Sequence, residues 1–311
     1  MKRLLRALPY TACAVLGGSG VAFQADLIGD VAAERSALPT STAMFLIGTF
    51  VLAATVLCTP RTRVALLRLP ATARRHRIAR RDLLNGLGGA ATIIVQAVAV
   101  GPLGVAMFTL GMIGGQIGGG LALDAIGSTG RRIPIGPVRL LSGALVLTAV
   151  ALGSANGAEA PSPVMLGLAI GGGVVGAWVG AASSRVHRAT GCLPAAALLN
   201  FAVGATGLII ATVALGEWAM VLSALLDLRL IPAALLGIVA ISLSTLLVVR
   251  LGVLGLAVCW TIGQLATAIA LDALRPGTFS WLTVVSAVLM LLALVLMTLR
   301  APSPRAEPSA T

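Results

Sequence analysis

The sequence predicts an all-α integral membrane protein with ten transmembrane helices, arranged as two inverted five-helix repeats. Of its 311 residues, 58% are hydrophobic and only 10% are charged, and the mean hydropathy is +1.02. Soluble domains carry about 25% charged residues, so the apolar excess is expected to face lipid. The second half of the chain also repeats motifs of the first.

Ten apolar segments are long enough to cross a bilayer as helices, in which each backbone polar group is bonded internally. They lie at residues 7–29, 39–59, 83–100, 102–126, 136–153, 163–183, 194–216, 231–249, 251–273 and 280–299. Connections near Gly101 and near Arg250 are so short that the flanking segments are expected to form antiparallel hairpins. The first segment resembles a signal peptide, but we interpret it as a retained helix, because the repeat needs it as the partner of the sixth.

Basic residues indicate the orientation of the chain. If the N-terminus is cytoplasmic, 19 of the 22 Lys and Arg residues fall on the cytoplasmic side, and only Arg35, Arg229 and Arg275 fall outside. The positive-inside rule therefore predicts that both termini are cytoplasmic. The net charge of +12 is then a topology signal and gives little support to nucleic-acid binding. We interpret the basic segment 60–82 as a solvated cytoplasmic loop, with a patch for anionic lipid or a ligand as the alternative.

An internal repeat divides the chain into two units. GQIGGGLALD (115–124) and GQLATAIALD (263–272) are identical at five positions and lie 148 residues apart, and FLIGT (45–49) aligns with FAVGA (201–205) at an offset of 156. We expect a first repeat at 1–153, a second at 154–300 and a disordered cytoplasmic tail at 301–311. Because five is odd, the second repeat would enter the membrane inverted.

These motifs resemble the inner-membrane exporter branch of the drug/metabolite transporter superfamily. The resemblance rests on LG followed by GQL-x6-D at 251–272, on the related stretch at 103–124, and on FxxG at 45–48 and 201–204. It implies a bacterial inner-membrane bundle of ten helices for export or uptake of small metabolites. We expect export of small metabolites or drug-like compounds, without a cofactor. Single five-helix relatives must dimerise to obtain the inverted pair that is fused here, so the working unit is expected to be a monomer.

Inverted repeats place a substrate site at their interface, near the bilayer midplane. Polar side chains inside spans are costly and are expected to face such an interior, and two tryptophans lie nearer mid-span than the interfacial belts where Trp is usual. Interhelical hydrogen bonding and core packing are the alternatives for these residues. The substrate-pathway candidates are Gln24, Gln116, Trp178, Asn200, Trp260 and Gln264.

Three carboxylates near span ends, Asp26, Asp124 and Asp272, are the coupling or gating candidates. Asp124 and Asp272 sit toward helix C-termini, where the macrodipole disfavours negative charge, so a compensating group is expected. A salt bridge with Arg131 or Arg275, or a solvated rim, is the alternative to a gate or relay. The chain lacks the membrane-embedded Glu of the small multidrug-resistance relatives, so coupling to protons or another cation is left open.

Other functional classes have weaker support. The chain has no HExxH, GxSxG or Cys/His cluster, so neither an enzyme nor a metal site is predicted. Cys13, Cys58, Cys192 and Cys259 show no paired spacing, and no structural disulfide is expected. A channel or a non-transporting membrane scaffold is the remaining alternative, because neither needs a recognisable motif.

The basic-residue count makes the topology testable with single cysteines at Arg68 and Glu159 in a cysteine-free background. We expect an impermeant thiol reagent to label position 159 but not position 68 in intact cells, because only the former would face outward. Labelling at 68, or protection at 159 that persists after denaturation has ruled out burial, would contradict the predicted topology.

Overall fold

The computed structural model describes residues 2–75, 78–126, 136–154, 162–275 and 280–299, and all the elements in these ranges are helices. The helices are α1 (Lys2–Arg35), α2 (Ala37–Cys58), α3 (Pro60–Arg75), α4 (Arg80–Leu83), α5 (Asn85–Leu103), α6 (Val105–Ala125), α7 (Pro137–Ser154), α8 (Pro163–Thr190), α9 (Leu193–Ala214), α10 (Trp218–Leu225), α11 (Leu230–Ala273) and α12 (Trp281–Leu299). The predicted tail at 301–311 lies outside the described residues.

The all-helical, multi-pass class is confirmed. Among the described residues, seven helices are long and apolar enough to cross a membrane, or eight if α10 and the start of α11, which meet at 85°, form one broken span. Two shorter apolar helices, 140–154 and 281–296, coincide with the fifth and tenth predicted segments. The count of ten spans and the inversion of the repeats stay predictions.

Several helix boundaries differ from the predicted spans. The first helix continues to Arg35, beyond the predicted end at residue 29. Asp26, Asp30 and Glu34 recur every four residues and so share one helix face. Ion pairs between this face and arginines of other segments stabilise the last turns of the helix. The third and fourth spans separate at Gly104, beyond the predicted Gly101. Gly104 has a φ of 74°, which a residue without a Cβ adopts readily.

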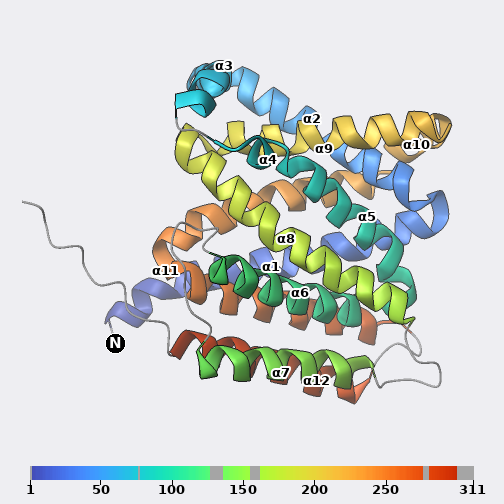
Figure 1. Cartoon of the computed structure of the whole chain (residues 1–311). Helices are drawn as coiled ribbons and strands as arrows, with labels where there is room; N and C mark the ends of the chain where they lie inside the picture. Colours follow the sequence, from blue (N-terminus) through green and yellow to red (C-terminus); the bar gives the residue numbers. More distant parts are fainter. Residues whose placement is uncertain (1, 76–77, 127–135, 155–161, 276–279, 300–311) are drawn as a thin grey trace, which may run out of the picture.

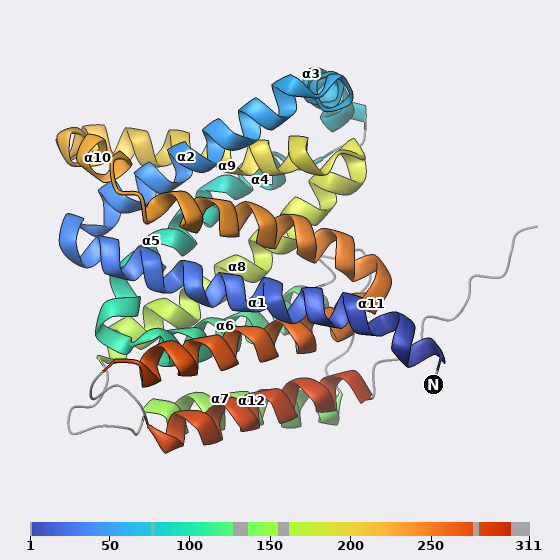
Figure 2. The ribbon, with the colours of Figure 1, turned by 180° about the vertical axis from the view of Figure 1, so that it is seen from behind.

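Helix α11 occupies the place of two predicted helices. It runs without a break in helical structure from Leu230 to Ala273, and Figure 2 shows it folding back on itself so that both of its arms lie beside α1. The predicted reversal near Arg250 is present, but it is helical and contains no loop. Retained helical hydrogen bonds suit an apolar environment that offers the backbone no other partners.

The long helices run between two ends of the bundle. Figure 2 shows the start of α1 and the end of α12 at the same end, which we call the inner end; the opposite one is the outer end. The predicted basic loop 60–82 contains α3 and α4. In Figures 1 and 2, α3 is seen along its axis while the long helices lie across the view, so α3 runs across the inner end.

Two equivalent close helix crossings occur in the bundle. Where α1 crosses α11, a Cβ on Gly18 would lie 2.0 Å from the carbonyl oxygen of Trp260; where α8 crosses α6, a Cβ on Gly173 would lie 2.1 Å from that of Met112. Trp260 and Met112 are separated by the same 148 residues as the repeated motifs. Small residues allow membrane helices this approach, and here they bring the first helix of each half onto the other half.

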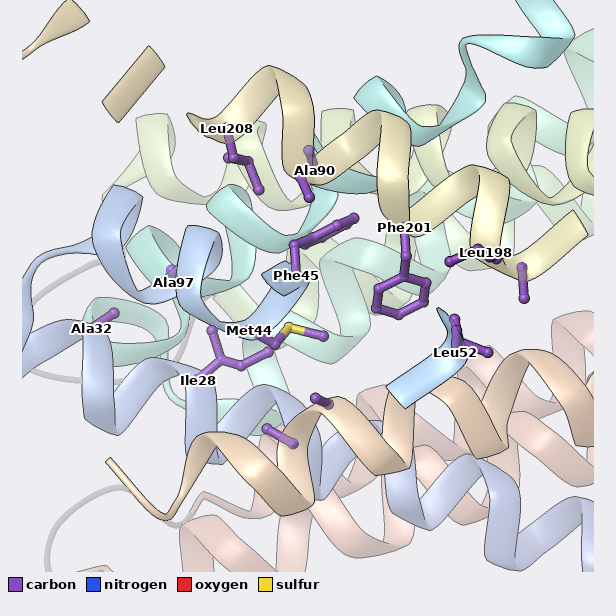
Figure 3. Packing of buried hydrophobic residues seen from close by; sticks show 14 of the residues in the cluster. Ile28, Ala32, Met44, Phe45, Leu52, Ala90, Ala97, Leu198, Phe201 and Leu208 are labelled. Carbon is purple, nitrogen blue, oxygen red and sulfur yellow. The ribbon is translucent and has the colours of Figure 1, made fainter. Parts of the chain in front are cut away.

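The FxxG motifs meet where α2 crosses α9. The rings of Phe45 and Phe201 lie 5.1 Å apart between centroids (Figure 3). A Cβ on Gly48 would lie 2.3 Å from the Phe201 ring, and one on Gly204 would lie 2.3 Å from the Phe45 ring. Each aromatic side chain therefore fills the space left by the glycine of the opposite motif.

Neighbouring glycines of α8 allow a matched test of the crossing. We expect Gly173→Ala to destabilise the protein by about 1–3 kcal/mol, because its Cβ would collide with the α6 backbone. Gly171 has no neighbouring atom within 4 Å of such a Cβ, so Gly171→Ala should leave the stability unchanged or raise it by up to about 1 kcal/mol. Thermal unfolding in detergent measures both. Equal melting temperatures would show that the helices do not approach this closely.

Candidate functional site

A cavity of about 540 Å³ lies among α1, α6, α8, α9 and α11. Its lining is mostly aliphatic and small. The polar and aromatic members are Gln116, Ser183, Ser184, His187, Asn200, Ser244, Trp260 and Gln264. Four of the six predicted pathway residues are thus brought together at one site.

Gln116 and Gln264, the repeated glutamines, both line this cavity from equivalent positions on α6 and α11. Only 8% of Gln264 is exposed. Within the described part of the chain, neither carboxamide has a hydrogen-bond partner. The glycine before each of them lies against the backbone of the facing helix: Cβ atoms on Gly115 and Gly263 would approach the carbonyl oxygens of Ile170 and Val15. The close crossings therefore hold both glutamines at the cavity.

Asn200 and Trp260 are more constrained by their neighbours. The side-chain amide of Asn200 donates to the side-chain oxygen of Asn85, and Asn85 in turn donates to the backbone oxygen of Asp82. A Cβ on Gly17 of α1 would collide with the Trp260 ring, so α1 packs directly on that ring. Asn200 therefore links α9 to α5, and Trp260 offers the cavity an aromatic wall held by α1.

Gln24 and Trp178, also predicted as pathway residues, do not line this cavity. The amide nitrogen of Gln24 lies 4.0 Å from the sulfur of Met44, and Gln24 is 5% exposed. The ring of Trp178 faces Gly88 of α5. Both side chains contribute to helix packing at the positions that the structure gives them.

His187 and three serines line the cavity although sequence reasoning did not select them. Ser183, Ser184 and His187 follow Gly176 and Gly180 on one face of α8, since residues three or four apart lie side by side on a helix. The Nδ1 atom of His187 is buried without a hydrogen-bond partner in the described part of the chain. The spacing of these small and polar residues in the sequence was the available signal.

Asp272 closes the outer end with an unexpected partner. Its two carboxylate oxygens accept hydrogen bonds from the backbone amides of Val105, at 2.9 Å, and Ala106, at 2.8 Å. These amides begin α6 just after the break at Gly104, and Asp272 is 5% exposed. The positive end of α6 thereby compensates a carboxylate that lies near the negative end of its own helix. The side chain of Asp124, the equivalent residue, lies outside the described part.

The three arginines predicted to lie on the non-cytoplasmic side of the membrane, Arg35, Arg229 and Arg275, are all paired with acids at the outer end. Arg275 contacts Asp26 at 2.6 Å and Asp30 at 2.8 Å. Asp26 thus forms a salt bridge with Arg275, which is the alternative to a gate or relay at this carboxylate. Interactions of this kind offset the cost of placing charge beside the hydrocarbon.

A second ionic cluster joins the end of α1 to the start of α11. Asp227 binds Arg35 at 3.2 Å and Arg229 at 2.8 Å, and Arg229 also binds Glu34. The hydrogen bond from Arg229 holds the pKa of Asp227, in the connection between α10 and α11, well below its ordinary value. The cluster therefore stays ionised and fixes α1 to the second half.

The inner end has a similar ion pair. Arg185, near the end of α8, binds both carboxylate oxygens of Asp82, in α4, at 2.7 and 2.8 Å. Asp82 directly precedes α5, as Asp227 precedes α11. In each case an arginine from the first helix of one repeat binds an acid that comes before the third helix of the other.

No group of three or more His, Cys, Asp or Glu residues could hold a metal ion among the residues described. Polar groups at the cavity are amides, hydroxyls, an indole and an imidazole. They can bind an organic molecule by hydrogen bonds and stacking.

One family model matches the chain over residues 9–152 and 164–296, and its family is described as "Putative inner membrane exporter, YdcZ". The two matched segments fall on the two predicted repeats. No individual curated protein matches the chain.

The inner ion pair can be tested by a double-mutant cycle. We expect Asp82→Asn and Arg185→Gln each to destabilise the protein by about 1–3 kcal/mol, because the first takes the opposite charge from the partly buried Arg185 and the second takes it from the buried Asp82. The double variant should lose less than the sum of the two. Thermal unfolding in detergent gives the three values, and Arg188→Gln, an exposed arginine of the same helix, is the control. Strictly additive losses would show that the pair is not coupled.

Proposed function

We propose that this chain, which belongs to the family of putative inner membrane exporters YdcZ, is a secondary transporter that exports small organic molecules by alternating access between two inverted repeats. Its family membership confirms the resemblance carried by the repeated motifs. The apolar helices agree with a multi-pass protein of the inner membrane. Transport by rocking halves is the mechanism usual for inverted repeats.

Two groups of helices support this mechanism. Helix α1 packs mainly on α11, and α8 packs mainly on α5 and α6, so each group combines the first helix of one repeat with the third and fourth of the other. Gln116 belongs to the α8 group and Gln264 to the α1 group. A cavity lined by both glutamines therefore lies between the groups, where a rocking motion would change its exposure.

The outer end of this interface is closed. A Cβ on Gly29 of α1 would lie 2.7 Å from a methyl group of Val100 in α5, and Asp272 of the α1 group binds the start of α6 in the other group. The equivalent pair at the inner end is α8 with α11, and there Ser184, His187 and Ser244 line the cavity instead. This asymmetry is what an inward-facing state of a carrier would have.

The repeat also suggests how the inner end closes. Asp272 and the amides of Val105 and Ala106 correspond, at the offset of 148, to Asp124 and the amides of Val253 and Leu254. In the outward-facing state, α11 would open at Gly252, the counterpart of Gly104, so that Asp124 accepts hydrogen bonds from those two amides while Asp272 releases its own. The two aspartates are then alternating latches, and either could also carry a coupling proton or cation.

A channel or scaffold remains the alternative function. A carrier is favoured because the cavity is closed at one end by hydrogen bonds between the two groups of helices. Neither a channel nor a scaffold needs such a cavity. Reconstituted protein should show saturable counterflow of its substrate, which a channel does not. One chain holds both groups, so we propose a monomer as the working unit.

Opposite effects of the two aspartates test the alternating mechanism. The reporter is Ser183→Cys in a cysteine-free background, labelled by an impermeant thiol reagent in inside-out vesicles. We expect Asp272→Asn to slow labelling and Asp124→Asn to speed it, each by up to about tenfold, because hydrogen bonds to a charged group contribute about 1.5–3 kcal/mol and each substitution weakens one latch.

Asp30→Asn is the matched control, since Asp30 lies at the outer end and pairs with Arg275 on the same group of helices as itself. It should leave the labelling rate unchanged. If the variants fold and both aspartate substitutions change labelling in the same direction, or not at all, the alternating latch is wrong.

A further inference from the structure

In the described part of the chain, the lining of the cavity offers a bound ligand no acidic side chain, lysine or arginine. Of the arginines on α8, Arg185 is bound to Asp82. Arg188 is exposed and donates to Ser184.

An ionic ligand would therefore lose its hydration without gaining a counter-ion. Burying an unpaired charge costs far more than burying a polar group that finds hydrogen bonds. The acids that could neutralise a cation are engaged elsewhere, as with Asp26 and Arg275 at the outer end. The lining thus discriminates against both cations and anions.

The two glutamines are among the polar side chains of the cavity without a partner in the described part of the chain, as is the Nδ1 atom of His187. The hydroxyl of Ser244 donates to the carbonyl of Ile241, and the amide of Asn200 donates to Asn85. Gln116 and Gln264 have no such partners among the residues described. Each carboxamide offers a donor and an acceptor side by side, which matches a ligand group that also presents both.

Beside these amides the cavity is apolar and has an aromatic wall. Trp260 lines it together with aliphatic side chains such as Val179, Ile241 and Leu256. Aromatic rings stack on tryptophan with a gain beyond the area buried. The lining therefore suits a flat ring that carries one polar edge.

We propose that the cavity binds uncharged aromatic molecules that carry a carboxamide or lactam, with the amide held by Gln116 and Gln264 and the ring placed against Trp260. This substrate class rests on the proposed function. The substrate class can be tested separately from alternating access, because a carrier could work by the same alternation on a charged substrate.

Three probe molecules of nearly equal shape test which ligand charge and which ligand hydrogen-bonding pattern the cavity accepts. Benzamide is neutral and carries an adjacent donor and acceptor; benzamidine is a cation and benzoate an anion near neutral pH. Binding is measured by calorimetry on protein in nanodiscs. We expect saturable binding of benzamide and at least tenfold weaker binding of the other two.

The glutamines are then replaced by the apolar, similarly sized leucine. Gln116→Leu and Gln264→Leu should each weaken benzamide binding by about tenfold, equivalent to about 1.4 kcal/mol, while Gln24→Leu, outside the cavity, should not. Correct folding of each variant is checked by its melting temperature. Toluene, which lacks the amide, should bind the wild type and both variants with similar affinity.

Several outcomes would overturn this assignment. They are tighter binding of benzamidine or benzoate than of benzamide, no saturable binding of benzamide, or benzamide affinities in the cavity variants equal to that of the wild type. None of these depends on the labelling experiment with Ser183→Cys. The substrate class can therefore fail while alternating access holds, and alternating access can fail while benzamide still binds.

Discussion

The fold depends on helix crossings in which a glycine meets the backbone of the facing helix. Lipid supplies little hydrophobic force to hold helices together, so close packing must do so. Gly18 and Gly173 provide it at equivalent places, where a Cβ would meet a carbonyl oxygen at about half a normal contact distance. These crossings attach α1 to α11 and α8 to α6, and the two glutamines beside them reach one cavity as a result.

Charge is confined to the ends of the bundle by pairing. At the outer end, three arginines are matched by carboxylates of α1 and by Asp227, and at the inner end Arg185 is matched by Asp82. Asp272 instead uses the amides at the start of α6. With these groups engaged, the polar chemistry left to the cavity is mostly neutral, which connects the stability of the bundle to the kind of ligand that we propose.

Much of this arrangement could be predicted from apolar segment length and internal repetition. The segments give the helices, and the shared offset drew attention to Gln116 and Gln264, which the structure places at one cavity together with Asn200 and Trp260. The partner of Asp272 could not be predicted, because it is a pair of backbone amides that carry no side-chain signal and lie far away in the sequence. His187 was missed since one histidine has no motif, and Gln24 was selected because its polarity alone cannot distinguish packing from a cavity wall.

The exchange of first helices between the halves affects how the protein is made. The hydroxyl of Ser19 meets the carbonyl of Gly263, a partner 244 residues later in the chain. At about 5–20 residues per second, a ribosome reaches that partner roughly 10 to 50 s after it has made α1. Helix α8, in contrast, emerges when α5 and α6 are already in the membrane. Biogenesis is therefore asymmetric in a chain of two similar units: the second half can dock as it is inserted, while the glycine face of α1 stays uncovered until α11 has been made.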